Sequence, residues 1–246
     1  MHFKFPSLLV YNRKPAELGK LIGWKLEPDT ESGKSMDCIT GDTKAKECIE
    51  EIVRNTFEAI QDAYNYQTEK APKLDYPNGQ RLSRIVFPQK RDNTTRISEQ
   101  ELRFVFVEQL IKKIQEGWDV YYSVETPTLG TYSGFSNGET PKQDEKGRSG
   151  EFDLVIFNNR LERIALIEFK ANNASDHEHM KDFVKLNNSK EGDALRYFIE
   201  IVKSFDKGTL SSLHSKIEGN EPIFRCWSLG EGKDITKDIC RAIIKK

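Results

Sequence analysis

The sequence predicts an α/β fold in which helices cover both faces of a mixed β-sheet. Two observations carry this prediction. Segments with a helical period alternate with short apolar segments of strand length along the second half of the chain. Two of the short segments, residues 152–157 and 164–169, are apolar at nearly every position instead of alternating, which is typical of strands buried on both faces.

Residues 1–92 are predicted to form an N-terminal α+β extension of unknown role. Short apolar runs mixed with Pro and Gly at its start suggest short strands and loops. From Thr43 onward, apolar residues recur every three or four positions, which predicts an amphipathic helix over residues 43–67. After a joint rich in Pro, Gly and Asn, a strand is expected at residues 82–87.

Residues 93–246 are predicted to form the second domain. Ser98 opens a helix that runs to Ile114. A strand at 119–126 and a polar loop at 129–150 then lead into the two apolar strands, which a short polar turn joins into a hairpin. The remaining elements are predicted helices at residues 177–186, 193–205 and 210–217, a strand at 223–229 and a helix at 235–244.

Composition excludes two classes of protein. Lys and Arg number 38 against 39 Asp and Glu, so the net charge of -1 argues against a protein that coats nucleic acid by bulk electrostatics. No apolar run approaches the roughly 18 residues that a membrane span needs, and no secretory signal is visible, so we expect a cytoplasmic protein without membrane contact. The four cysteines have no metal-ligand spacing and are expected to be buried thiols in a reducing compartment.

The predicted hairpin carries three charged side chains at one end of its apolar strands. If the turn is centred between residues 160 and 161, Asp153 faces Glu168 directly, with Cβ atoms about 5 Å apart. Because side chains alternate along a strand, Lys170 lies on the same face as Glu168. The prediction depends on this turn, since a shift of one residue in register would separate the charged groups.

Two carboxylates held this close repel each other, and a cation between them relieves the repulsion. Mg²⁺ suits such a place, because it binds oxygen ligands, accepts one or two protein carboxylates and keeps waters that phosphate oxygens can replace. The lysine cannot bind the metal, but it can orient or deprotonate a metal-bound water, or neutralise charge that builds up at phosphorus. The alternative is a structural cross-strand salt bridge between Lys170 and Glu168 or Asp153.

The helix that Ser98 opens adds a fourth charged residue. On a helical projection Glu99 alone of the three helix glutamates lies toward the apolar stripe, where it needs a partner that a metal site would supply. Glu101 is expected to form a capping box with Ser98, and Glu108 is expected to be solvated. Arg103 shares the face of Glu99, where it would meet a phosphate or pair with Glu99.

Other basic residues are candidate nucleic-acid contacts. Three lysines follow the hairpin by a short helix, where they would touch phosphates or form a solvated helix face: Lys181, Lys185 and Lys190. Between Arg81 and Lys113, eight basic residues stand against four acidic ones. This local excess of positive charge is compatible with a nucleic-acid footprint.

Three segments together resemble the PD-(D/E)xK nuclease superfamily, whose fold is restriction-endonuclease-like. They are SEQEL at residues 98–102, GEFDLVIF at 150–157 and ALIEFK at 165–170. The resemblance covers about residues 96–246 and departs from the pattern at Phe152, where the family motif has proline. It implies a core of αβββαβ order, a mixed sheet flanked by helices.

The resemblance also implies an activity, that of a metal-dependent nuclease that hydrolyses phosphodiester bonds through a metal-bound water. Asp153 and Glu168 would hold Mg²⁺, with Mn²⁺ expected to substitute. Lys170 would serve the attacking water, and Glu99 would act further from the metal or at a second one. DNA is the favoured substrate over RNA, and cutting both strands of a duplex would favour a homodimer.

Two other readings of the same residues stay open. The first is a non-catalytic module that binds nucleic acid or docks a partner on a nuclease-like fold. The second is a purely structural α/β protein whose hairpin charges form a salt bridge.

Overall fold

A seven-stranded mixed β-sheet forms the centre of the part of the chain that the computed structural model describes, residues 41–68, 81–134 and 140–241. The strand order is β2-β1-β3-β4-β5-β6-β7. The strands are β1 Tyr121–Ser133, β2 Lys142–Gln143, β3 Arg148–Phe157, β4 Arg163–Ala171, β5 Leu195–Val202, β6 Ile223–Ser228 and β7 Lys233–Asp234.

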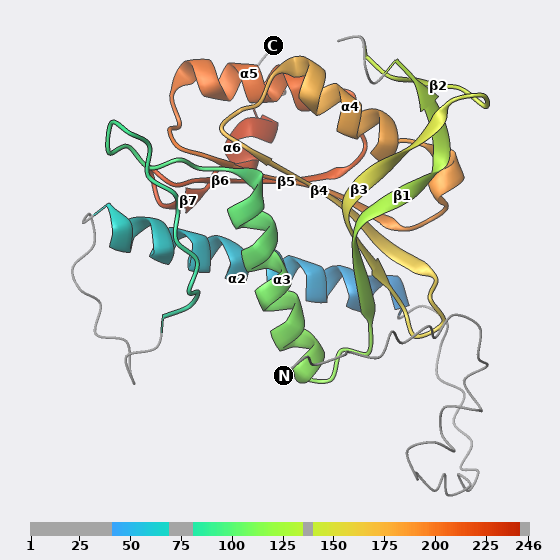
Figure 1. Ribbon diagram of the computed structural model, residues 1–246, viewed down its shortest axis with the longest axis horizontal. Coiled ribbons are helices and arrows are strands. Elements are labelled where there is room, and N and C mark those ends of the chain that lie inside the picture. Colours follow the sequence, from blue (N-terminus) through green and yellow to red (C-terminus); the bar gives the residue numbers. More distant parts are fainter. Residues whose placement is uncertain (1–40, 69–80, 135–139, 242–246) are drawn as a thin grey trace, which may run out of the picture. The chain divides into compact units, whose positions relative to one another are not determined.

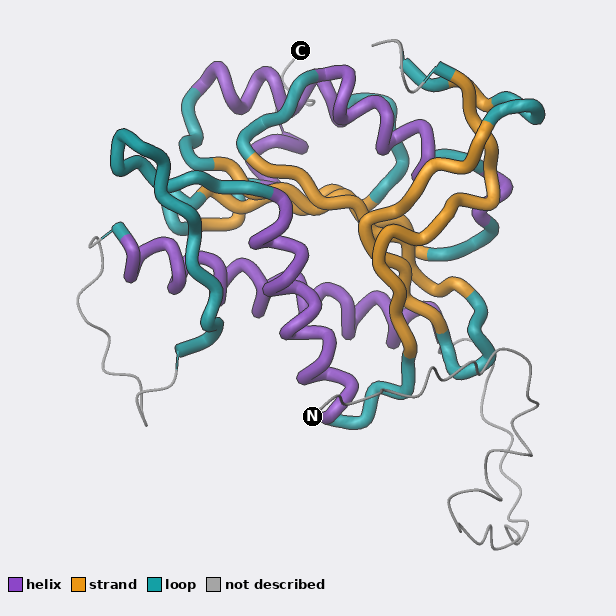
Figure 2. Tube along the Cα trace, viewed as in Figure 1, coloured by secondary structure: helices purple, strands orange, loops and turns teal. Residues whose placement is uncertain are grey.

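Helices cover both faces of this sheet, which confirms the predicted α/β class (Figures 1 and 2). They are α2 Gly41–Gln67, α3 Glu99–Gln115, α4 Asp176–Leu186, α5 Lys207–Ile217 and α6 Thr236–Arg241, with a short 3-10 helix, η2, at Ser189–Glu191. One apolar cluster joins α2 and α3 to the sheet through residues such as Phe57, Phe106 and Phe169. A second cluster joins α4, α5 and α6 to the opposite face.

The strand directions divide the sheet into two halves. Strands β1, β3 and β4 pair in antiparallel fashion, whereas β5 and β6 run parallel to β4. Within the β3–β4 hairpin, Leu154 pairs with Ile167 and Val155 with Leu166, so the predicted register is confirmed there. A bulge then pairs Phe157 with Arg163.

The helix predicted at residues 193–205 is wrong, because this segment is strand β5. Its side chains are buried from Tyr197 to Val202, where β5 lies between two parallel neighbours. A strand buried on both faces is apolar almost continuously, and such a run also contains helical spacings. The β-branched residues Ile199, Ile201 and Val202 are the local signal for a strand.

Two other expectations need correction. The segment at 82–87 forms no strand of the sheet, and the nearest pairing is an isolated bridge between Gln89 and Thr95. The polar segment at 129–150 is not a loop throughout, since β1 continues to Ser133 and β3 begins at Arg148.

The helix predicted at residues 43–67 is confirmed as α2. It packs on α3, and Ile49 and Phe57 share one apolar cluster with Leu102 and Phe106. This cluster therefore crosses the boundary expected between residues 92 and 93. The short strands expected near the N-terminus and the joint at 71–80 lie outside the described residues.

None of the helices within the described ranges combines the length and the apolar character that a bilayer span requires. Cys48, Cys226 and Cys240 are free thiols. Cys226 is fully buried, and this burial raises the pKa of its thiol well above the usual value.

Replacing Phe198 tests the packing between the sheet and α4. Phe198 is fully buried in β5, and its ring stacks 4.6 Å from that of Phe183. We expect Phe198→Ala to lower the free energy of unfolding by about 3–5 kcal/mol, because the deletion leaves a cavity in the second apolar cluster. Phe104→Ala is the control, since Phe104 is 55% exposed and its truncation should cost less than about 1 kcal/mol. Urea unfolding measures the free energy of unfolding of both variants. Equal decreases in this free energy would contradict the described core.

Candidate functional site

The four predicted catalytic residues come from three elements of the fold. Glu99 is the first residue of α3, Asp153 lies in β3, and Glu168 and Lys170 lie in β4. The strand pairing that runs from Phe157 and Arg163 ends at Leu154 and Ile167, so Asp153 and Glu168 lie one residue beyond its last pair, on adjacent strands. Side-chain contacts then connect this hairpin to α3 and α4.

Local sequence explains why α3 begins at Glu99. The backbone N–H of Ser98 donates to Glu101 Oε2 over 3.0 Å, so the predicted capping box is confirmed. Glu101 is buried, whereas the side chain of Glu99 is 43% exposed, so the prediction that Glu99 alone lies toward the core is wrong. Arg96 lies 3.7 Å from the carboxylate of Glu101, which compensates its burial. The expectation that Glu108 is solvated is wrong, because it accepts a hydrogen bond from Ser83 Oγ at 2.7 Å.

Asp153 is held against the neighbouring strand. The backbone N–H of Phe169, the residue after Glu168, donates to Asp153 Oδ2 over 2.7 Å, which fixes the carboxylate against β4. Arg103 Nη1 lies 4.0 Å from the other oxygen, Oδ1. One oxygen is thus engaged by the backbone, while the other faces a cation at a longer distance.

Glu168 is the most buried acid of the site, with 1% of its surface exposed. Its Oε1 lies 2.5 Å from Lys185 Nζ in an ion pair. Burial, together with the negative charges of Asp182 and Asp153, raises the pKa of Glu168 well above its ordinary value. A cation close to this carboxylate is therefore needed to keep it ionised.

Lys170 joins α3 to α4. Its Nζ lies 2.7 Å from Asp182 Oδ2 and 3.4 Å from Glu99 Oε2. Burial alone would lower the pKa of Lys170, but the carboxylates of Asp182 and Glu168 outweigh burial and hold the pKa above its ordinary value. Lys170 is accordingly a charged ammonium group in this arrangement, and not a base.

Asp182 stands between the two lysines of the site. Its Oδ1 lies 2.8 Å from Lys185 Nζ, while its Oδ2 contacts Lys170. Burial would raise the pKa of this carboxyl, yet the two ammonium groups hold the pKa below its ordinary value. Asp182 therefore stays charged and fixes both lysines.

The sequence interpretation missed Asp182. The available signal was its position on α4, where Asp182 and Lys185 lie three residues apart on the face that carries Phe183 and Leu186. Charged residues on the apolar face of a helix need partners, and here the partners are the charges of β4.

The sequence predicts that Lys185 touches a phosphate or lies on a solvated helix face. The structure shows neither a solvated position nor a free ammonium group at this residue. It is buried, and besides the two carboxylates it donates to the backbone carbonyl of Glu151 at 2.8 Å. Lys181 is partly exposed on α4. Arg103 forms no ion pair with Glu99 among the described residues, since Nη2 donates to Gln100 at 2.6 Å and Nη1 lies 3.5 Å from Glu125; its contact with a phosphate stays a prediction.

Glu125 is a further acid of the site that sequence reasoning did not identify. It lies in β1 between residues that pair with Leu154 and Phe152, and therefore beside Asp153. Its backbone has a φ of 49°, a left-handed conformation that is rare for a residue other than Gly, Asn or Asp. Backbone strain of this kind gathers at functional sites, although it also occurs in bulges.

Asp153 and Glu168 are the candidate ligands for a metal ion at this site. Among the described residues, no group of three or more His, Cys, Asp or Glu side chains is arranged to hold a metal. Asp153 and Glu168 on adjacent strands supply two carboxylates, which is the number that Mg²⁺ commonly takes from a protein while it keeps several waters. Glu168 Oε1 is paired with Lys185 Nζ at 2.5 Å, so the two carboxylates fit a hard cation in their chemistry, and one of their oxygens is held by a cation of the chain itself.

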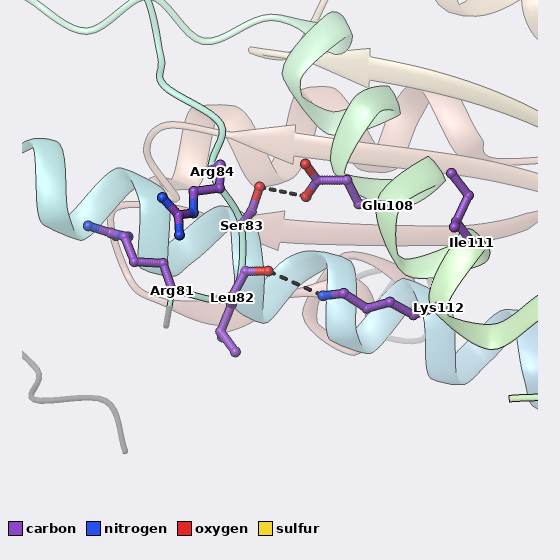
Figure 3. A pocket seen from close by; sticks show the side chains of 7 residues that line it. All are labelled: Arg81, Leu82, Ser83, Arg84, Glu108, Ile111 and Lys112. Atoms are coloured by element: carbon purple, nitrogen blue, oxygen red, sulfur yellow. Dashed lines mark hydrogen bonds between the residues drawn. The ribbon is translucent and has the colours of Figure 1, made fainter. Parts of the chain in front are cut away.

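A surface pocket lies apart from these carboxylates. It has a volume of about 410 Å³ and is lined by residues 81–84 and by Glu108, Ile111 and Lys112 of α3 (Figure 3). Its polar groups largely satisfy one another, because Ser83 donates to Glu108 and Lys112 donates to the carbonyl of Leu82 over 3.3 Å. None of the predicted catalytic residues lines it.

Comparisons with known proteins assign no function to the site. No protein-family model, no curated protein and no solved structure matches the chain.

Proposed function

We propose that this protein is a metal-dependent nuclease that hydrolyses phosphodiester bonds, with DNA as the favoured substrate. One observation carries the proposal: Asp153 of β3 accepts a hydrogen bond from the backbone of Phe169, the residue after Glu168 in β4, and Lys170 of the same strand contacts Glu99 of α3 at 3.4 Å. Residues far apart in sequence thus form one group of acids with a lysine. The same four residues fill the motif of the PD-(D/E)xK resemblance.

The element order supports the restriction-endonuclease-like core that the resemblance implies. With the two-residue strand β2 set aside, the chain runs α3, β1, β3, β4, α4, β5, which is the order αβββαβ. The first three of these strands are antiparallel and the fourth is parallel to its neighbour, so the sheet is mixed. A purely structural role would not require this order together with charged residues on the central strands.

In the proposed reaction, Asp153 and Glu168 hold Mg²⁺, with Mn²⁺ as a substitute. The bound metal would act as a Lewis acid and lower the pKa of a water. Lys170, held as an ammonium by Asp182, orients the attacking water and neutralises negative charge that develops on the phosphate. Glu99 and Asp182 position Lys170, because each carboxylate contacts its Nζ.

Glu168→Gln and Lys170→Met test this assignment. Both side chains keep their approximate size, and the fold should survive, since Lys185 and Asp182 still pair with each other in either variant. We expect each substitution to lower the rate of Mg²⁺-dependent plasmid or oligonucleotide cleavage at least about 100-fold. Circular dichroism and thermal unfolding would check that each variant is folded.

Glu47→Gln and Lys237→Met are the matched controls, because they make the same chemical changes at exposed positions of α2 and α6. These two variants should cleave at the rate of the unchanged protein. Site variants as active as the controls would refute the nuclease proposal. A protein that binds DNA but never cleaves it with Mg²⁺ or Mn²⁺ would favour the non-catalytic module instead.

The dependence of cleavage on pH distinguishes an ammonium from a base at Lys170. The carboxylates around Lys170 raise its pKa, so raising the pH from about 6 to 10 should not remove its proton. Arginine is charged throughout this range. We therefore expect plots of log kcat against pH to have the same shape for the unchanged protein and for Lys170→Arg, even where the variant is slower. A rise with pH that is present only with lysine would identify Lys170 as a base.

A further inference from the structure

A short basic hairpin precedes the first turn of α3. Residues 88–96, which we call the basic hairpin, are closed by an isolated bridge between Gln89 and Thr95. Lys90 N–H donates to Thr94 O over 2.8 Å, and Arg96 N–H donates to Pro88 O over 2.8 Å. Backbone hydrogen bonds along its length give this exposed segment a defined shape.

The turn of the basic hairpin is further ordered by Asp92. Its Oδ1 accepts hydrogen bonds from the backbone and the hydroxyl of Thr94, at 3.0 and 2.6 Å. These bonds lower the pKa of the Asp92 carboxyl. Asn93 has a φ of 60°, a left-handed conformation that asparagine tolerates well in turns.

Positive charge dominates the surface of this hairpin. Lys90, Arg91 and Arg96 are all exposed, against the single acid Asp92. Neither Lys90 nor Arg91 forms an ion pair with any residue that the structure describes, whereas Arg96 lies 3.7 Å from Glu101. Two cations are thus exposed to solvent without an ion-pair partner in the described part of the chain, although the charge of Lys90 acts on the nearby Asp92.

The base of the hairpin is fixed beside the candidate site. Ile97, which follows it, is buried, and its carbonyl accepts a hydrogen bond from Asn172 Nδ2 at 2.6 Å. Asn172 comes directly after β4, the strand that carries Glu168 and Lys170. After Ile97 the chain continues through Ser98 into Glu99, the first residue of α3. Figure 1 draws this part of the chain as the green-teal segment that enters α3.

The reach of the hairpin can be bounded by chain length. Arg91 and Glu99 are eight positions apart in the chain, which at roughly 3.3 Å per residue gives a span of about 26 Å. Successive phosphates of one DNA strand are about 3.4 Å apart along the helix axis, so this span corresponds to at most about eight nucleotides. The exposed cations therefore lie within reach of phosphates close to any bond held at the site.

We propose that the basic hairpin binds backbone phosphates of the DNA that flanks the cleaved bond, through Lys90 and Arg91. This inference rests on the proposed function for its substrate, but it concerns binding and not cleavage. The contacts are to phosphate and carry no sequence preference. Lys90 and Arg91 provide a local positive surface for DNA on a chain whose net charge is close to zero.

The double variant Lys90→Gln/Arg91→Gln tests the inference in the full-length protein. Its control is Arg160→Gln/Lys237→Gln, which removes the same charges from exposed positions. Arg160 lies in the turn before β4, at the end of that strand opposite to Lys170, and Lys237 lies on α6.

Binding of a fluorescein-labelled DNA duplex of about 30 base pairs, roughly 100 Å long, would be followed by anisotropy in EDTA over a range of salt concentrations. We expect the hairpin variant to bind about tenfold more weakly at low salt and to lose about two units of the salt slope. The control variant should match the unchanged protein. In Mg²⁺, the hairpin variant should raise KM and leave kcat unaltered at saturating DNA.

The outcomes separate this inference from the proposed function. If the hairpin variant binds DNA as the control does, or if the unchanged protein does not bind DNA at all, the inference is overturned. If the hairpin variant binds weakly but the unchanged protein never cleaves, the inference stands and the nuclease proposal fails. A lowered kcat with no change in binding would also overturn it, because the hairpin would then act on the site through structure alone.

Discussion

The burial of Glu168 is the constraint on which the arrangement of the site depends. Strand β4 lies in the middle of the sheet, with α2 and α3 against one face and α4, α5 and α6 against the other. A carboxylate taken out of water at such a position costs several kcal/mol unless cations and hydrogen bonds compensate it. The compensating ammonium group comes from Lys185, so α4 has to lie across the sheet with this residue facing inward.

The same compensation extends from Glu168 to the rest of the site. Lys185 needs the carboxylate of Asp182 and the carbonyl of Glu151, and Asp182 in turn holds Lys170. Lys170 then reaches Glu99 at the start of α3. Each of these charged groups compensates the charge of the next one. A single buried acid therefore fixes the positions of side chains from β4, α4 and α3 and of a backbone carbonyl of β3.

The sequence was informative where the interactions are local. The hairpin register followed from the turn length, and the start of α3 followed from the Ser98 and Glu101 pattern, since both depend on residues close in the chain. Helix α2 was predictable from its period of three and four. The identity of β5 was not, because a strand buried on both faces carries no alternation.

The missed members of the site have a different physical cause. Asp182 and Glu125 are ordinary charged residues in sequence, as is Lys185, whose expected role was wrong, and only the packing of α4 and β1 against the hairpin gives these residues their roles. A solvated helix face and an inward-facing ion pair contain the same residue types. Which of them forms depends on how the helix is rotated on the sheet, and that rotation is set by contacts distant in sequence.

The ion pair between Lys185 and Glu168 also bears on how the protein would take up a metal. In proteins whose fold depends on metal, the unliganded donors are left uncompensated and the chain unfolds. Here the buried carboxylates already have ammonium counter-ions from the chain itself. On the nuclease proposal, a divalent ion arriving at Glu168 would therefore exchange with a resident cation instead of completing a fold, and folding and metal loading would be separate events.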